Sequence, residues 1–131
     1  MIRNVERKWR MNSEIREKLE GVGIDVNDLM DRLMGNMTLI SRFFKRFPDD
    51  ASYERMVAGI EKGDVEEAFR GAHSLKGVCA NLSMKRFLTV LNPLVDKLRE
   101  GQLDGVPVML SSVDEEYRKV VTMIQDITWN G

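Results

Sequence analysis

The chain has 131 residues and a formal net charge of −1, with 43% hydrophobic and 31% charged side chains. This length suits one domain with its own core, and the near-neutral charge argues against a nucleic-acid or membrane-surface partner. The single cysteine excludes an internal disulfide, and no apolar run approaches the roughly 20 residues of a membrane span. Charged residues between Arg3 and Arg10 break any signal-peptide core, so we expect a cytoplasmic protein.

The first 22 residues are charged but partly periodic. Two apolar series recur at three- and four-residue steps, namely Ile2, Val5 and Trp9, then Ile15, Leu19 and Val22. They predict either one amphipathic helix with a polar gap or two short helices, the second capped by Asn12 or Ser13. We expect residues 1–22 to form a helical extension that covers one end of the main domain, residues 23–131. Pairing with a partner and a loose segment are the alternatives.

Two helices are predicted before Pro48. The first ends near Gly35 and has these apolar residues on one side: Val26, Leu29, Met30, Leu33 and Met34. The second, capped by Asn36, carries the strongest apolar stripe of the chain: Leu39, Ile40, Phe43, Phe44 and Phe47. Both series predict core positions. Pro48 kinks or interrupts this helix because it lacks an N–H donor, and the pattern resumes through Tyr53 to Ile60.

Three further helices are predicted after Gly63. The first runs from about Asp64 to Leu82, and Asp64 with Glu67 forms a capping box at its start. Ser83 is expected to cap the second, in which Pro93 produces a bend. Apolar positions of the last two helices are Phe87, Leu88, Leu91, Leu94, Val95, Leu98, Val113, Tyr117, Val120, Val121, Ile124 and Ile127.

Successive amphipathic helices with short connections pack as bundles. The expected fold is therefore all-α, an up-down-up-down antiparallel four-helix bundle with additional short N-terminal helices. Its main helices should start near Met37, Asp64, Met84 and Val108.

His73 is the one histidine of the chain. In a helical projection, the positions within about 60° of the pole opposite His73 are Ala68, Leu75, Val78, Cys79 and Leu82. That half predicts the buried face, which leaves His73 in solvent. Gly77 removes a side chain one turn away, and Lys76 places a cation beside the ring. Because a neutral imidazole is a competent nucleophile, this surrounding suits a histidine that accepts and surrenders a phosphoryl group.

The segment Ala72-His73-Ser74-Leu75-Lys76-Gly77, followed by Val78-Cys79-Ala80-Asn81-Leu82, resembles the signature of histidine-containing phosphotransfer (HPt) domains of multistep phosphorelays. The family pattern is approximately A-H-x-L-K-G-x-x-x-N-[LI]-G. With the predicted helix joints, the resemblance covers about Gly23 to Ile127.

The resemblance implies a phosphohistidine carrier without a kinase or ATP-binding domain of its own. A receiver domain with an aspartyl phosphate docks on the His73 face, and the ring nitrogen farther from the backbone attacks the phosphorus in line. Phosphohistidine then passes the group to another receiver. The receiver supplies the magnesium, so this chain needs no cofactor. We expect a monomer, since a bundle of this kind closes its core without a second chain.

The same resemblance assigns roles to individual residues. Lys76 offsets charge on the phosphoryl oxygens, and Gly77 gives the receiver clearance. Expected partner-binding residues are Phe69, Arg70, Ala80, Lys85 and Arg86. For the three cations in this set, ordinary solvated charge is an equal alternative, and Phe69 is either an exposed docking contact or a partly covered edge residue. Cys79 falls on the buried half and is expected to pack.

Three positions depart from the family pattern. Ser83 replaces a glycine, Val95 stands about where many members carry a glutamate, and Asn92-Pro93 lies inside a helix. They affect the shape of the helix after His73 more than the activity.

Other classes of function remain open. The runner-up is an adaptor that binds receivers without phosphate turnover, against which the intact His73 argues. A general base needs an orienting carboxylate, and Glu66 is about 10 Å away along the helix. A kinase dimerisation hairpin carries an acidic residue where Ser74 stands. We expect no metal site, because the ligand spacing is missing.

Overall fold

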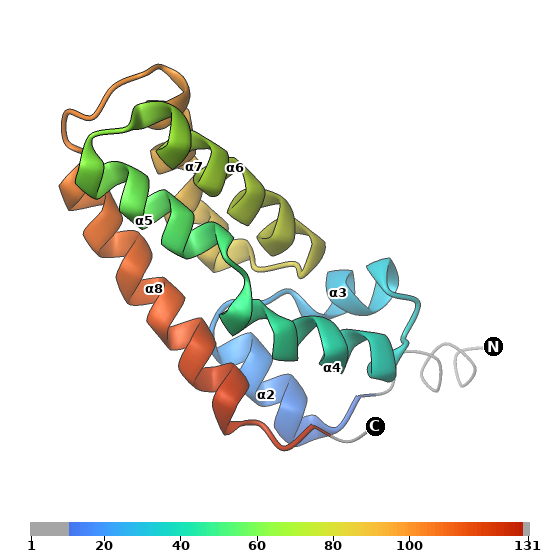
Figure 1. Ribbon diagram of the computed structural model, residues 1–131. Coiled ribbons are helices and arrows are strands. Elements are labelled where there is room, and N and C mark those ends of the chain that lie inside the picture. The colour runs from blue at the N-terminus through green and yellow to red at the C-terminus, as the bar shows by residue number, and fades with distance from the viewer. Residues whose placement is uncertain (1–10, 130–131) are drawn as a thin grey trace.

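The computed structural model describes residues 11–129, and this part of the chain contains helices and no strand. The elements in chain order are α2 (Ser13–Gly21), α3 (Val26–Arg32), α4 (Met37–Arg46), the 3₁₀ turn η1 (Phe47–Asp49), α5 (Ser52–Lys62), α6 (Val65–Asn81), α7 (Lys85–Arg99) and α8 (Val106–Asp126) (Figure 1). The predicted all-helical class is confirmed. The strict up-down-up-down order stays a prediction.

Four helices form the bundle that carries His73. Helix α5 packs against α6, α6 against α7 and α7 against α8, while α8 also contacts α5. Figure 1 shows α2, α3 and α4 gathered at one end of this bundle, with α8 reaching from the bundle to them. The first bundle helix therefore starts at Ser52, not near Met37, because η1 at Pro48 interrupts the chain and turns α4 away.

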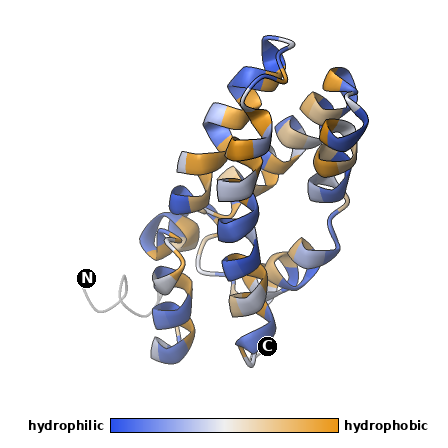
Figure 2. Ribbon diagram, turned by 90° about the vertical axis from the view of Figure 1, so that its left-hand side faces the viewer, coloured by the Kyte–Doolittle hydropathy of each residue, from blue (hydrophilic) through white to orange (hydrophobic). Residues whose placement is uncertain are grey.

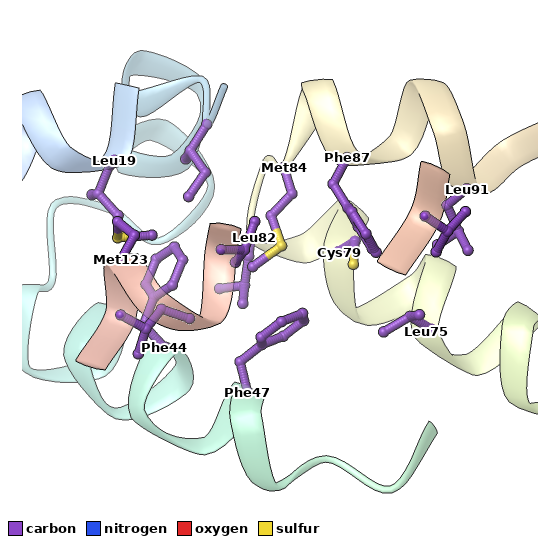
Figure 3. Packing of buried hydrophobic residues seen from close by; sticks show 14 of the residues in the cluster. Leu19, Phe44, Phe47, Leu75, Cys79, Leu82, Met84, Phe87, Leu91 and Met123 are labelled. Atoms are coloured by element: carbon purple, nitrogen blue, oxygen red, sulfur yellow. The ribbon is translucent and has the colours of Figure 1, made fainter. Parts of the chain in front are cut away.

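One hydrophobic core runs through both regions. Every helix contributes to it, and Figure 3 shows Leu19 of α2 and Phe44 of α4 near Met123 of α8. Figure 2 shows hydrophobic and hydrophilic residues on different sides of the helices, as an amphipathic pattern requires. Helix α2 thus packs on the core through Ile15 and Leu19. Ile2, Val5 and Trp9 lie outside the described residues, and the division at residue 22 stays a prediction.

Met34 was expected in the core and is instead 72% exposed. Helix α3 ends at Arg32, and Met34 adopts a left-handed conformation with a φ of 55° in the turn before α4. Its side chain therefore leaves the line of Val26, Leu29 and Met30, which are buried as predicted.

The predicted helix caps are confirmed in part. Asn36 accepts a hydrogen bond from the backbone N–H of Leu39 at 3.0 Å, and Asp64 accepts one from the N–H of Glu67 at 3.1 Å. The carboxylate of Glu67, however, pairs with Arg55 of α5 and does not return to Asp64. The predicted capping box is therefore wrong in its second half, because a tertiary ion pair replaces the local one.

Ser83 does not cap α7, contrary to the sequence prediction. It occupies the left-handed region with a φ of 54°, and Met84 is the residue that precedes the helix. The Ser83 hydroxyl donates to Oδ2 of Asp28 at 2.7 Å, and its carbonyl accepts from the N–H of Asp25 at 2.9 Å. These bonds to the start of α3 hold a serine in a conformation that favours glycine.

The Ser83–Asp28 bond makes stability depend on pH. The hydrogen bond from Ser83, followed by that from Arg32, lowers the pKa of Asp28 from 3.8 to about 2. The unfolded chain therefore takes up this proton before the folded one does, so the stability contributed by Asp28 is present above about pH 4 and is lost as pH falls towards 2.

We expect Ser83→Ala to be less stable than the native chain at pH 7 and to lose less stability between pH 5 and pH 2. Urea unfolding followed by circular dichroism at several pH values measures both differences. Parallel pH curves for the two proteins would contradict this assignment.

Helices α5 and α6 approach each other through two glycines. A Cβ placed on Gly71 would lie 2.4 Å from the backbone N of Met56, and one on Gly59 would lie 2.4 Å from the backbone N of Ala68. Neither helix can retreat without uncovering the core, so glycine is required at both positions. Beside this contact, the Ser52 hydroxyl donates to Oγ of Ser74 at 2.8 Å, next to His73 in the sequence.

Two alanine substitutions in α6 should have opposite effects. We expect Gly71→Ala to lower the free energy of unfolding by about 2 kcal/mol, since the methyl group meets backbone. Gly77→Ala should raise it by about 0.5–1 kcal/mol, because alanine favours the helix and no atom lies within 4 Å of the new Cβ. Urea denaturation of both variants tests this; equal changes would exclude the proposed α5–α6 contact.

Candidate functional site

His73 lies in the middle of α6 on its solvent-facing side. The opposite side of the helix is buried through Ala68, Leu75, Cys79 and Leu82, as the helical projection predicted, whereas Val78 is only half-buried. His73 itself is exposed. The prediction that the histidine faces solvent is therefore confirmed.

The imidazole has one aromatic neighbour. The ring of Phe69, one turn earlier, lies with its centroid 5.5 Å from that of His73 at an interplanar angle of 32°. The guanidinium carbon of Arg99, at the end of α7, lies 5.5 Å from the same Phe69 ring, and Asp96 holds Arg99 at 2.8 Å. Phe69 is half-buried. Its ring is thus partly covered, and its role as a docking contact stays a prediction.

No hydrogen bond or ion pair within residues 11–129 involves the His73 ring. The neighbouring side-chain bonds of α6 are made by other residues, including Ser74, Glu66 and Arg70. Glu66, considered above as a partner for a general base, pairs with Arg70 at 2.6 Å. Both ring nitrogens are consequently free to interact with a molecule that approaches from solvent.

Three further predicted site residues flank His73 on α6. Lys76 is half-buried and makes no ion pair with any residue that the structure describes. Gly77 is exposed and has no atom within 4 Å of where a Cβ would lie. Ala80 is half-buried and lies within about 20° of the His73 direction on the helix. Because Gly77 has no side chain and Ala80 has only a methyl group, the surface of α6 beside the imidazole is open to an approaching molecule.

The other predicted cations already have partners in the fold. Arg70 pairs with Glu66 at 2.6 Å, and Lys85 lies 3.5 Å from Oδ2 of Asp28. Arg86 donates from Nη1 to the carbonyl of Gly21 at 3.0 Å. Their role in binding a partner stays a prediction, but much of their charge is compensated locally.

A groove that the sequence did not predict lies between α4, η1 and the C-terminal end of α6. Its volume is about 220 Å³, and its lining residues are Phe43, Arg46, Phe47, Asp50, Val78, Asn81 and Leu82. Phe47 and Leu82 are labelled in Figure 3. Asn81 belongs to the motif quoted above, and α4 was predicted as a core helix. The sequence does not show how the chain turns at Pro48. It therefore could not predict that α4 and Asn81 line the same groove.

The other two departures from the family pattern, Val95 and Asn92-Pro93, lie in α7. Val95 is fully buried, so this position faces the core. The side-chain carbonyl oxygen of Asn92, beside Pro93, is buried and has no hydrogen-bond partner among residues 11–129. The bend expected at Pro93 stays a prediction, although α7 continues through it. Burial raises the pKa of the Cys79 thiol above its ordinary value, which keeps it in the unreactive protonated form.

Within residues 11–129, no group of three or more His, Cys, Asp and Glu side chains is placed to hold a metal ion. None of the helices that the structure describes is long and apolar enough to span a bilayer.

Comparison with protein families gives a match over most of the chain. A family model described as "Hpt domain" matches residues 38–126, a span that includes α5 to α8 and all the site residues named above. Neither the curated proteins nor the solved structures contain a match.

The contact between Phe69 and His73 can be tested by NMR, since the single histidine makes assignment simple. We expect Phe69→Leu to shift the His73 ring-proton resonances, because the ring current of Phe69 is lost, and to lower the free energy of unfolding by about 1 kcal/mol. Phe43→Leu, on the groove, is the control and should leave these resonances in place. Unchanged His73 resonances in Phe69→Leu would contradict this contact between the two rings.

Proposed function

Because the chain belongs to the Hpt domain family, whose members are phosphocarriers of phosphorelays and interact with receiver domains, we propose that His73 is its carrier residue. His73 accepts a phosphoryl group from the aspartyl phosphate of one receiver domain and gives it to the aspartate of another. The observation that carries this proposal is the solvent-facing imidazole, without a partner in residues 11–129, beside the open position at Gly77.

The transfer is a displacement at phosphorus. The lone pair of the unprotonated ring nitrogen, the one farther from the backbone, forms an N–P bond while the P–O bond to the aspartate breaks. The carboxylate leaves with the bonding electrons, and the other ring nitrogen keeps its proton. Magnesium, expected in the receiver, neutralises the phosphoryl oxygens when bound. The reverse displacement by a second carboxylate returns the imidazole to its starting form.

The residues around His73 support this chemistry through position and charge. Phosphoryl transfer needs little covalent help from the protein, so alignment and charge compensation account for most of the rate. Lys76, three residues along the helix and without an ion pair in the described part of the chain, compensates the phosphoryl oxygens. Gly77 has no side chain, so the receiver can approach α6 closely at this position. In this proposal the chain works as a monomer that neither binds nor hydrolyses ATP.

The first test is transfer from receiver domains charged with labelled phosphate. We expect acid-labile, base-stable label on the native chain and none on His73→Gln. Lys76→Gln should transfer roughly tenfold more slowly, which corresponds to about 1.4 kcal/mol of lost charge compensation. Binding of receivers without any label on His73 would favour the adaptor alternative and exclude the carrier role.

A second experiment tests whether Gly77 acts by leaving room for the receiver or by affecting the reactivity of the His73 imidazole. Gly77→Leu should lose transfer from receivers at least tenfold, because the side chain fills the approach path, while a small donor such as phosphoramidate should label it as well as the native chain. Gly77→Ala is the size control. Equal loss with both donors would show that Gly77 acts on the imidazole itself.

A further inference from the structure

Helix α4 presents an unusual concentration of uncompensated positive charge. Its ten residues include Arg42, Lys45 and Arg46 and no acidic residue. All three side chains are exposed. None of them takes part in any ion pair within residues 11–129. This contrasts with Arg70 and Lys85, which are paired.

One of these three cations, Arg46, lines the groove described above. Arg46 and Phe43 line the groove from α4, and Val78, Asn81 and Leu82 line it from α6. Asp50 is its one carboxylate, and this side chain already accepts a hydrogen bond from the N–H of Ser52 at 2.9 Å. The groove is thus mainly apolar, with Arg46 and Asp50 as its charged lining residues, and two further cations, Arg42 and Lys45, lie on the same helix as Arg46.

The exposed Asn81 connects the groove to the side of α6 that carries His73. Val78 and Asn81 follow His73 by five and eight residues, a rise of about 8 and 12 Å along the helix axis, and they are turned from His73 by about 140° and 80°. Gly77 lies between them and the imidazole and has no atom within 4 Å of a would-be Cβ. A partner that contacts both places meets no side chain from Gly77.

We propose that α4 and this groove form the docking surface for the receiver domain, with acidic groups of the receiver facing α4 and an apolar side chain of the receiver in the groove. This inference rests on the proposed function. A donor of aspartyl phosphate carries a phosphoryl dianion and the carboxylates that bind its magnesium, so its reacting face is anionic. Along α6, the groove residues lie about 8–12 Å from His73, which is comparable to the Debye length at 0.1 M salt, and the cations of α4 therefore steer that face towards His73.

The apolar part of the groove contributes to specificity for the receiver by accepting one of its apolar side chains. Its volume of about 220 Å³ is several times the roughly 30 Å³ that one water occupies in the liquid, which leaves room for an apolar side chain of the partner. Phe43 is only half-buried in the free chain, so a partner that covers it gains further hydrophobic burial.

The test combines a charge reversal on α4 with a matched reversal elsewhere. Arg42→Glu with Lys45→Glu changes two exposed cations of α4. Lys62→Glu with Lys97→Glu changes two cations that also lack ion pairs within the described residues but lie on α5 and α7, away from the groove. Both double variants change the net charge equally. Equal urea midpoints establish that both fold.

Transfer from a charged receiver is measured at 50 mM and 1 M salt, and labelling by phosphoramidate is measured in parallel. We expect the α4 variant to transfer at least tenfold more slowly at 50 mM salt and to approach the native rate at 1 M, where the Debye length is only about 3 Å. The control variant should stay within twofold of the native rate. Phosphoramidate should label all three proteins equally.

Phe43→Ser tests the apolar part of the same surface and should weaken receiver binding at both salt concentrations. The docking surface is wrong if the α4 variant transfers at the native rate, or if the control loses as much. If neither donor labels the native His73, the proposed function itself fails, and that result is distinct from a failure of docking.

Discussion

The backbone contact between α5 and α6 determines the geometry on which the rest of the site depends. With Gly59 and Gly71 at the interface, the two helices pack without intervening side chains. This brings Ala68 and Ala72 fully into the core and fixes the rotation of α6 about its axis. Once that rotation is fixed, His73 must point to solvent, since it lies one residue after a buried alanine. The exposure of the functional side chain is thus a consequence of close packing on the opposite side of the same helix.

The interruption at Pro48 has a comparable influence on the surface around His73. A continuous helix from Met37 to Lys62 would have placed α4 in line with α5. The 3₁₀ turn instead directs α4 to the end of α6, where its apolar side packs with α8 and the C-terminal segment, as in the stacking of Phe44 on Trp129 at 5.6 Å. The same turn leaves the opposite, basic side of α4 in solvent. A local backbone constraint therefore creates both an extension of the core and a charged surface.

Much of this structure could be predicted from the sequence. Apolar periodicity locates the helices, Asn36 and Asp64 mark two helix starts, and the motif around His73 identifies its exposed position and the family. These features depend on residues close together in the chain.

The features that escaped prediction depend on residues far apart in the sequence. Ser83 adopts a glycine-like conformation because Asp28 holds its hydroxyl, Glu67 leaves its capping position for Arg55, and the groove requires α4 to reach Val78. Nothing near Gly71 in the sequence reveals that the backbone of Met56 lies against it. Helical periodicity carries no information about which distant backbone a small residue will meet.

The lack of any hydrogen bond to the His73 ring within residues 11–129 has a thermodynamic consequence for the proposed carrier. Phosphorylation of His73 then breaks no hydrogen bond or ion pair of the described fold. Loading and unloading of the phosphoryl group therefore cost the fold none of these interactions, and the Lys76 ammonium group is available to the phosphoryl oxygens in both directions of transfer.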